Sequence, residues 1–447
     1  MQKASVSRIK KDMTHLVEKV GLRLAGSAGD RAAMEYIADQ FALYADECVI
    51  EEFPVTCRDV KTEVLEIRIG GKWQQFPASL FGSAPGTFGK TLSGKIVYFA
   101  PQTDFQREDL SYLEGKVVVF WGTHIEKPDD YRRLLEAQPA FLLMTDTRYP
   151  AGYALADGLF PAYVRKYGAI PTMNVAYLDV VRWFDEKATD ARLKITGGLR
   201  PSTSGNVVAT LYGSDPDAGI LYIGGHHDTQ AGSVGADDNA MGVCTAMETL
   251  RLLAKEPRKR TIKFISFGAE EQLSVGSAEY VRKHRKEVSE QGKFMVNVDS
   301  ASSKVGWNYI MWQCDTRARK LLTEIAHKQD YYFVENTNLC PYGDHFPFCA
   351  AGVPAMWYMR ENCVTGRYFH HRPDDDLTKV SFDLIARVAD ISAEFLRTAA
   401  NAPVLPFAGK LPKEFEAPTV KCWRDLFGGW KGLAPMPENL LENLLEK

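Results

Sequence analysis

Several features that mark particular classes of protein are missing from this 447-residue chain. No stretch approaches the ~18 consecutive apolar residues that a membrane-spanning helix requires. The first residues, MQKASVSRIKKDMTHLVEKVG, lack the apolar centre of a secretory signal and instead place apolar residues at helical spacing among charged ones. We therefore expect a soluble, cytoplasmic protein without a membrane partner.

An excess of positive charge is missing as well. The 54 lysines and arginines face 57 aspartates and glutamates, which leaves a formal net charge of -3. Proteins that bind nucleic acids neutralise phosphates with a surplus of basic side chains and release counterions. No nucleic-acid partner is expected.

Paired cysteines are also absent, because none of the eight cysteines forms a Cys-x-x-Cys pair. A structural zinc ribbon needs such pairs, so this class of metal site is excluded. In a long chain without an export signal we expect reduced thiols rather than disulfides.

The composition is that of an ordinary globular protein with a large core, since 45% of the residues are hydrophobic and 25% are charged. The length corresponds to two or three domains. We expect residues 1–59 and 199–402 to form one domain and residues 60–198, with their short strands and turns, to form an inserted β-rich domain. Residues 403–447 are expected to form a C-terminal tail that ends in a short amphipathic helix.

The pattern after Arg200 alternates strands with helices, which is typical of a parallel sheet with helical crossovers. This predicts an α/β fold with a mostly parallel sheet, in which the first and last parts of the chain form one domain. Expected strands are 48–53, 206–212, 220–224, 261–267, 294–298 and 355–359, and expected helices are 9–20, 31–44, 240–254, 275–285, 317–327 and 382–397.

Acidic and imidazole side chains crowd the carboxyl ends of these strands, where open α/β sheets place their sites. One strand runs into His226, His227 and Asp228. A metal-bound imidazole usually donates its other ring proton to a carboxylate, a role that Asp228 could fill for His226. Taken alone, two histidines at a strand end are more often core or surface residues than ligands.

Further acids follow the same pattern. The segment GADDNAMG carries Asp237 before a helix, although such residues are also ideal helix caps. The apolar strand TIKFISFG leads to Glu270 and Glu271, adjacent carboxylates that repel each other and need a cation or a proton. The strand FMVNV ends in Asp299, where a lone acid could instead cap a turn.

The C-terminal half adds the segments CPYGDHFPF and RYFHHRPDDDL, and the marked segments together hold five of the nine histidines. Individually each segment has an ordinary structural explanation, but five consecutive landmarks with metal-type ligands favour a metal site. Histidine and carboxylate donors without paired cysteines indicate one or two catalytic Zn²⁺ ions, for which Mn²⁺ or Co²⁺ could substitute.

These motifs resemble, in order, those of the co-catalytic two-zinc exopeptidases, the family that includes bacterial leucyl aminopeptidase, aminopeptidase Y and glutamate carboxypeptidase. The resemblance implies a three-layer αβα fold with helices on both faces of the sheet. The N-terminal GLRLAGSAGD is similar to the opening segment of the family, and the block from GKVVVFWG to AIPTMNVA is similar to a protease-associated domain.

The resemblance also implies a site with two zinc ions per chain. Glu270 would be the general base and Asp228 would support His226. Because His370 and His371 are adjacent, either could be the last ligand; the family pattern of a later proline and aspartate favours His371, and His345 receives no ligand role. The implied metal ligands, with Asp237 shared by both ions, are His226, Asp237, Glu271, Asp299 and His371.

The activity implied is that of a zinc exopeptidase acting on peptides, most commonly an aminopeptidase. Tyr342 is expected to donate a hydrogen bond to the reacting carbonyl. Arg360 and Arg367 could clamp a substrate carboxylate and would then favour a carboxypeptidase, unless they are solvated loop residues. A single-zinc glutaminyl cyclase and a non-catalytic peptide-binding relative are further alternatives, and a homo-oligomer is left open.

Overall fold

The computed structural model describes residues 2–147 and 152–441. The chain divides into two compact units, Met1–Val55 with Thr203–Gly432, and Thr56–Ser202 with Leu433–Lys447. None of the described helices is both long enough and apolar enough to cross a lipid bilayer.

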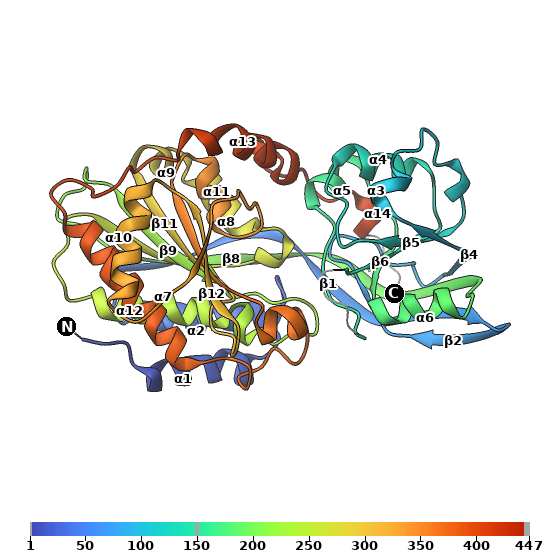
Figure 1. Ribbon diagram of the computed structural model, residues 1–447, viewed down its shortest axis with the longest axis horizontal. Helices are drawn as coiled ribbons and strands as arrows, with labels where there is room; N and C mark the ends of the chain where they lie inside the picture. Colours follow the sequence, from blue (N-terminus) through green and yellow to red (C-terminus); the bar gives the residue numbers. More distant parts are fainter. Residues whose placement is uncertain (1, 148–151, 442–447) are drawn as a thin grey trace. The chain divides into compact units, whose positions relative to one another are not determined.

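The first unit is built on a mostly parallel sheet, as predicted (Figure 1). Strands β9, β10, β11 and β14 run parallel, whereas β8 and β12 pair antiparallel with β10 and β14. The strand order is β13 (Val334–Asn336), β12 (Trp307–Gln313), β14 (Ala355–Glu361), β11 (Gly292–Val298), β9 (Ile220–His226), β10 (Thr261–Phe267) and β8 (Asp190–Leu211).

Helices cover both faces of this sheet and give three layers (Figure 1). One face is covered by α1 (Val6–Thr14), the π-helical turn His15–Val20, α2 (Ala28–Ala42), α7 (Met241–Leu253), α10 (Thr316–His327) and α12 (Phe382–Asn401). The other face is covered by α8 (Val275–Lys283), α9 (Arg285–Gln291), α11 (His345–Ala350) and α13 (Lys413–Phe427).

The apolar sequence of β9 explains why both faces are covered. Successive side chains of a strand point to opposite faces, so Leu221 and Ile223 pack on one side while Ile220 and Tyr222 pack on the other. A strand buried on both faces is apolar along its whole length. The central strands are therefore held between two hydrophobic cores.

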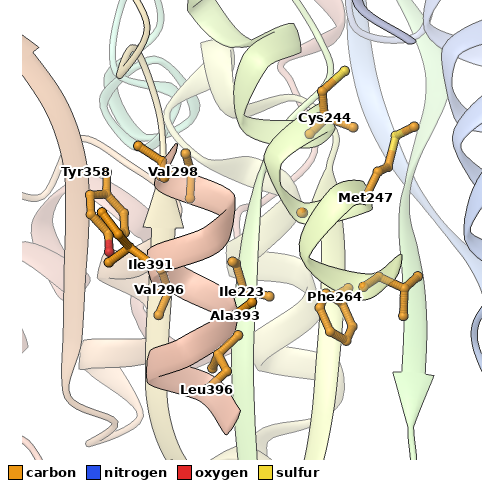
Figure 2. Close-up of a cluster of buried hydrophobic side chains, with 14 of the residues drawn as sticks. Ile223, Cys244, Met247, Phe264, Val296, Val298, Tyr358, Ile391, Ala393 and Leu396 are labelled. Carbon is orange, nitrogen blue, oxygen red and sulfur yellow. The ribbon is translucent and has the colours of Figure 1, made fainter. Parts of the chain in front are cut away.

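Figure 2 shows the larger of these cores between the sheet and helices α7 and α12. Ile223, Phe264 and Val296 come from three neighbouring strands, and Met247 and Leu396 come from the two helices. All five side chains are at most 1% exposed. This packing fixes the carboxyl ends of the strands, where the acidic segments begin.

Two strands are longer than the sequence pattern predicted. Strand β1 covers Glu47–Ile69 rather than 48–53, and β8 covers Asp190–Leu211 rather than 206–212, because both continue from one unit into the other.

Residues 403–447 were expected to form a separate tail, but residues up to Gly432 are part of the first unit. Helix α13 packs against α11 in the first unit, where Phe427 stacks on Phe346 with ring centroids 5.2 Å apart.

The described part of the second unit contains parallel strands together with helices. Its strands are β4 (Thr91–Phe99), β5 (Val117–Trp121), β6 (Phe141–Thr145) and β7 (Thr172–Val175), with β3 (Ala78–Leu80) antiparallel to β7 and β2 (Lys72–Phe76) antiparallel to β1. Its helices are α3 (Pro101–Asp104), α4 (Pro128–Glu136), α5 (Pro161–Tyr167), α6 (Tyr177–Asp185) and α14 (Glu438–Leu441).

Candidate metal centre

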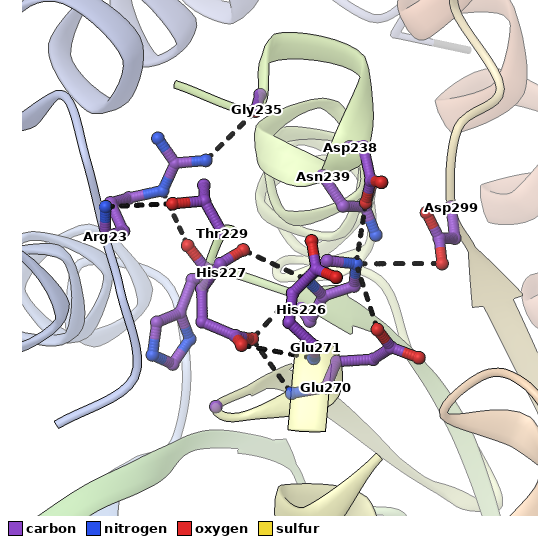
Figure 3. A network of polar contacts seen from close by, with 12 residues as sticks. Arg23, His226, His227, Thr229, Gly235, Asp238, Asn239, Glu270, Glu271 and Asp299 are labelled. Carbon is purple, nitrogen blue, oxygen red and sulfur yellow. Dashed lines mark hydrogen bonds and ion pairs between the residues drawn. The ribbon is translucent and has the colours of Figure 1, made fainter. Parts of the chain in front are cut away.

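Acidic and imidazole side chains from distant parts of the chain meet at the carboxyl ends of the central strands (Figure 3). The strand ends of β9, β10 and β11 supply three of the segments, and the loops before α7 and α12 supply the others. The side chains that come together are His226, Asp238, Glu270, Glu271, Asp299 and His371.

His226 is the last residue of β9 and lies at the centre of the cluster. Its Nε2 is 3.1 Å from Asp238 Oδ1, 3.7 Å from Asp299 Oδ2 and 3.8 Å from Glu270 Oε2. The imidazole is fully buried, and among the described residues Nε2 has no hydrogen-bond partner of acceptable geometry. A buried ring nitrogen surrounded by carboxylate oxygens fits a metal ligand, because buried polar atoms otherwise find partners.

The other side of Asp238 faces the two histidines of the C-terminal segment. Oδ2 of Asp238 is 3.4 Å from His371 Nε2 and 3.4 Å from His370 Nδ1, and His371 Nε2 lies 3.1 Å from Glu271 Oε2. Two ligand groups therefore overlap at Asp238. One comprises His226, Asp238 and Asp299, and the other comprises Asp238, His370 and His371.

The prediction that Asp237 is the shared ligand is wrong. Its carboxylate accepts hydrogen bonds from the backbone and hydroxyl of Ser302, at 2.8 and 2.7 Å, and from the Thr365 hydroxyl. The next residue, Asp238, points into the cluster instead. Spacing along the chain cannot distinguish two adjacent aspartates, and only their partners decide which one faces the site.

Asp375 holds this segment in place and was not predicted to do so. Its two carboxylate oxygens accept the backbone N–H groups of Asp237 and Asp238 at 2.9 and 3.0 Å. Asp375 is fully buried, although a run of three aspartates is usually a solvated loop. Burial raises the pKa of Asp375 well above its ordinary value.

Asp228 ties the ends of β9 and β10 together. Its carboxylate accepts the backbone N–H groups of Glu270 at 2.9 Å and Glu271 at 3.2 Å. Its Oδ1 also lies 3.4 Å from Nδ1 of His226. The hydrogen-bond partner of His226 Nδ1 is the backbone carbonyl oxygen of Asp228, at 3.1 Å, while the carboxylate holds the backbone of both glutamates.

His227, next to His226, faces away from the cluster. Its Nε2 is 3.0 Å from Asp30 Oδ1 and its Nδ1 is 2.9 Å from Ser266 Oγ. Both ring nitrogens are therefore engaged by hydrogen bonds in the interior. Alternation along the strand end explains why only one of the two adjacent histidines reaches the cluster.

The buried groups of the cluster shift each other's pKa values. Burial lowers the pKa of His226, but Asp299 and Glu270 raise it, and the net shift is well above the ordinary value. Burial raises the pKa of Glu270 strongly and that of Glu271 to about 7. Like charges in a buried site need a proton or a cation, so this donor set suits divalent zinc.

Of the predicted substrate-binding side chains, Arg360 is engaged by other groups. The Arg360 guanidinium donates to Asn308 Oδ1 and to the carbonyl oxygens of Val305 and Gly306. Tyr342 is 37% exposed in the loop before α11. The side chain of Arg367 lies outside the described part of the structure.

His345, in the same region, is buried against Trp357 with ring centroids 5.5 Å apart. Burial lowers its pKa to about 3, so the imidazole is neutral at physiological pH. A ring held in the core beside α11 differs from the charged surroundings of His226.

Comparison with known proteins gives consistent results. Residues 206–396 match the model for Peptidase family M28. Aminopeptidase YwaD of Bacillus subtilis (strain 168) is 24% identical over 404 residues, covering 85% of this chain and 81% of that protein. Carboxypeptidase Q of Rattus norvegicus is 23% identical over 378 residues, covering 81% and 79% of the two chains.

Solved structures share the fold. The structure of an aminopeptidase from Aneurinibacillus sp. strain AM-1 has a TM-score of 0.71 to this chain at 22% identity, and the likeness covers 90% of this chain and 96% of the other. An M28 peptidase precursor from Shewanella amazonensis SB2B has a TM-score of 0.73 at 22% identity, with 91% and 95% covered. The α/β architecture with helices on both faces is thus that of known aminopeptidase structures.

Replacement of the two adjacent aspartates should separate their roles. We expect Asp238→Asn to weaken zinc binding at least ~100-fold, since even partners of metal ligands contribute 10–100-fold. Asp237→Asn should retain zinc but lower the free energy of unfolding by ~1–3 kcal/mol, because buried donors lose a charged acceptor. Metal analysis after dialysis and denaturant unfolding check both variants; equal zinc loss in both would contradict the assignment.

The metal-free protein should lose stability as pH rises. The pKa of Glu271 is about 7 in the folded chain, above the ordinary value of 4.5, so the folded chain binds this proton more tightly than the unfolded chain does. The resulting contribution to the free energy of unfolding is fully present below a pH of about 4.5. It is lost as the pH increases through about 7. The melting temperature of the zinc-free protein, measured between pH 5 and 8, should therefore fall more steeply than that of Glu271→Gln; parallel curves would contradict this prediction.

Proposed function

We propose that this chain, which belongs to peptidase family M28, is a zinc-dependent aminopeptidase that hydrolyses the N-terminal peptide bond of its substrate. The observation that carries the proposal is the convergence of His226, Asp238, Asp299, Glu271 and His371 around a common centre, with Glu270 beside it. The likeness to aminopeptidases over most of the chain supports it.

Two zinc ions fit the donor set better than one. His226 with Asp299 provides one pair of donors, Glu271 with His371 provides another, and Asp238 presents one oxygen to each pair. The pairing of imidazole with carboxylate oxygen is typical of catalytic zinc, and no cysteine is among the ligand groups found in the described residues. His370, which lies as close to Asp238 as His371 does, is the alternative fifth ligand.

Glu270 is proposed as the general base. When bound, zinc supplies a Lewis acid and makes an attacking water nucleophilic at neutral pH. Glu270 has one oxygen 3.8 Å from His226 Nε2 and the other 3.1 Å from the Ser274 hydroxyl. From this position the carboxylate would take the proton of the attacking water and deliver it to the departing amine.

Asp228 is proposed to orient both ends of this machinery. It receives the backbone N–H groups of Glu270 and Glu271 while facing Nδ1 of His226. A carboxylate in this position fixes the ring orientation of a ligand histidine. Because the base and two ligands depend on one buried side chain, small displacements of Asp228 would affect all three.

The hydrogen bonds of Arg360 favour cleavage at the amino end of the substrate. A carboxypeptidase needs a cation that can clamp the terminal carboxylate, usually through the planar fork of an arginine. Both terminal nitrogens of Arg360 already donate, to Asn308 and to two backbone carbonyls. Sequence identity does not choose between the activities, since YwaD and carboxypeptidase Q are similar to this chain at 24% and 23%.

A panel of substrates tests the reaction and its polarity. With zinc present, we expect hydrolysis of aminoacyl-p-nitroanilides and of dipeptide amides, and no hydrolysis of dipeptides with a blocked N-terminus. Release of free amino acid from N-blocked dipeptides would show a carboxypeptidase instead. Cyclisation of N-terminal glutamine would indicate a glutaminyl cyclase, and binding without turnover would indicate a peptide-binding relative.

Removal of the proposed base should separate chemistry from metal binding. We expect Glu270→Gln to keep its zinc and to lower kcat by at least ~100-fold, the usual contribution of a general base. Glu416→Gln, an identical change at an exposed position of α13, serves as the matched control and should be fully active. Near-normal turnover by Glu270→Gln would remove Glu270 from this role.

A further inference from the structure

A fully buried arginine lies behind the metal centre. Arg23 is 0% exposed and sits in the segment between the π-helical turn His15–Val20 and α2. Burial of a guanidinium costs much free energy unless its donors are bonded. Burial lowers the pKa of Arg23 to about 10, so the side chain is still a cation at neutral pH.

The guanidinium binds both ends of the loop 227–235. Nε donates to the carbonyl oxygen of His227 at 2.5 Å, Nη1 to that of Val234 at 2.8 Å, and Nη2 to that of Gly235 at 2.9 Å. Figure 3 shows the arginine between these parts of the loop. One planar group therefore joins two backbone positions that are separated along the chain.

These two positions adjoin the candidate ligands. His227 directly follows His226, and Gly235 lies three residues before Asp238. A shift of either carbonyl would move a ligand whose side chain must stay within a few tenths of an ångström of its place. Arg23 thereby links the first ligand to the shared one through the backbone.

The N-terminal segment anchors the arginine from the other side. Nη1 also donates to the carbonyl oxygens of Leu16 at 3.1 Å and Gly21 at 3.0 Å. The backbone N–H of Arg23 donates to Thr229 Oγ1 at 3.1 Å, and the backbone N–H of Thr229 donates to the Arg23 carbonyl. The helical N-terminus is thus a fixed support for the loop.

We propose that Arg23 is a positioning residue of the metal centre, whose fork of donors sets the separation between His226 and Asp238. The inference rests on the proposed zinc site. The positive charge also interacts favourably with the carboxylates of Asp228, Asp375 and Asp238. Arg23 touches neither substrate nor reacting atoms and acts only through the loop.

The substitution Arg23→Lys separates the effect of the donor geometry from the effect of the positive charge. An ammonium group keeps the cation but carries only three N–H donors on a single nitrogen, so it cannot replace the planar fork that donates to five carbonyl oxygens. If Arg23 acted by charge alone, Arg23→Lys would behave as the wild-type protein. If it acts by position, the lysine variant should show a defect in metal affinity.

The experiment compares zinc affinity of the full-length wild type and Arg23→Lys, measured on metal-free protein by competition with a chelator of known affinity. We expect Arg23→Lys to bind zinc ~10–100-fold more weakly, as is usual when a partner of a metal ligand is lost. At saturating zinc, kcat should fall while KM for an aminoacyl-p-nitroanilide changes little. The melting temperature of the metal-free proteins reports folding separately.

Arg260 provides a matched control. It is another buried arginine, 4% exposed, whose Nη1 donates to the carbonyl oxygens of Ala399 and Ala402 at 2.9 and 2.6 Å. It directly precedes β10, at the end of the strand opposite to the site. Arg260→Lys should lower the melting temperature but leave zinc affinity unchanged.

The outcomes separate the inference from the proposed function. Equal zinc affinities of wild type and Arg23→Lys would overturn the inference, and so would an equal loss in Arg260→Lys. A wild-type protein that binds no zinc would refute the proposed function and the inference with it. If Arg23→Lys does not fold, Arg23→Gln, which keeps a planar group with two N–H donors but not the fork, replaces it; unchanged zinc affinity of that variant would then overturn the inference.

Discussion

Mutual repulsion among buried carboxylates governs this structure. Asp238, Glu271 and Asp299 are brought together where apolar strands end and helix α7 begins, with side chains that are at most 10% exposed. Such groups must bind protons or a cation. The two histidines that stand among them can accept some of the protons, and a divalent cation would neutralise the negative charge that remains.

The backbone around the cluster is held by two kinds of buried side chain with opposite chemistry. Asp228 and Asp375 accept hydrogen bonds from backbone N–H groups of the segments that carry the acids. Arg23 instead donates hydrogen bonds to carbonyl oxygens of the loop between His226 and Asp238. Donors and acceptors of the irregular backbone are thereby satisfied without solvent. Irregular chain at the end of a sheet is then as fixed as the strands themselves, which a site with several ligands requires.

The proposed ligands do not decide between the two ends of a peptide. Both an aminopeptidase and a carboxypeptidase are similar to this chain over about four fifths of its length, so a shared centre is compatible with either polarity. What differs must be the group that binds the charged terminus of the substrate. The engagement of Arg360 by Asn308 removes one cation from that role and leaves the amino end as the proposed point of recognition.

The sequence by itself determined the α/β class, most of the strands of the central sheet and the segments from which the site is built, because hydrophobic periodicity and the acids that follow each strand are local features. Strand 261–267 was predicted at its observed bounds, whereas β1 and β8 proved longer since their pairing extends beyond the pattern of one domain. Tertiary structure alone decided which of two adjacent residues faces the site. Asp237 turns to Ser302 and Asp375 holds the neighbouring backbone, over separations of 65 and 138 residues, and contacts of that range leave no trace in local spacing.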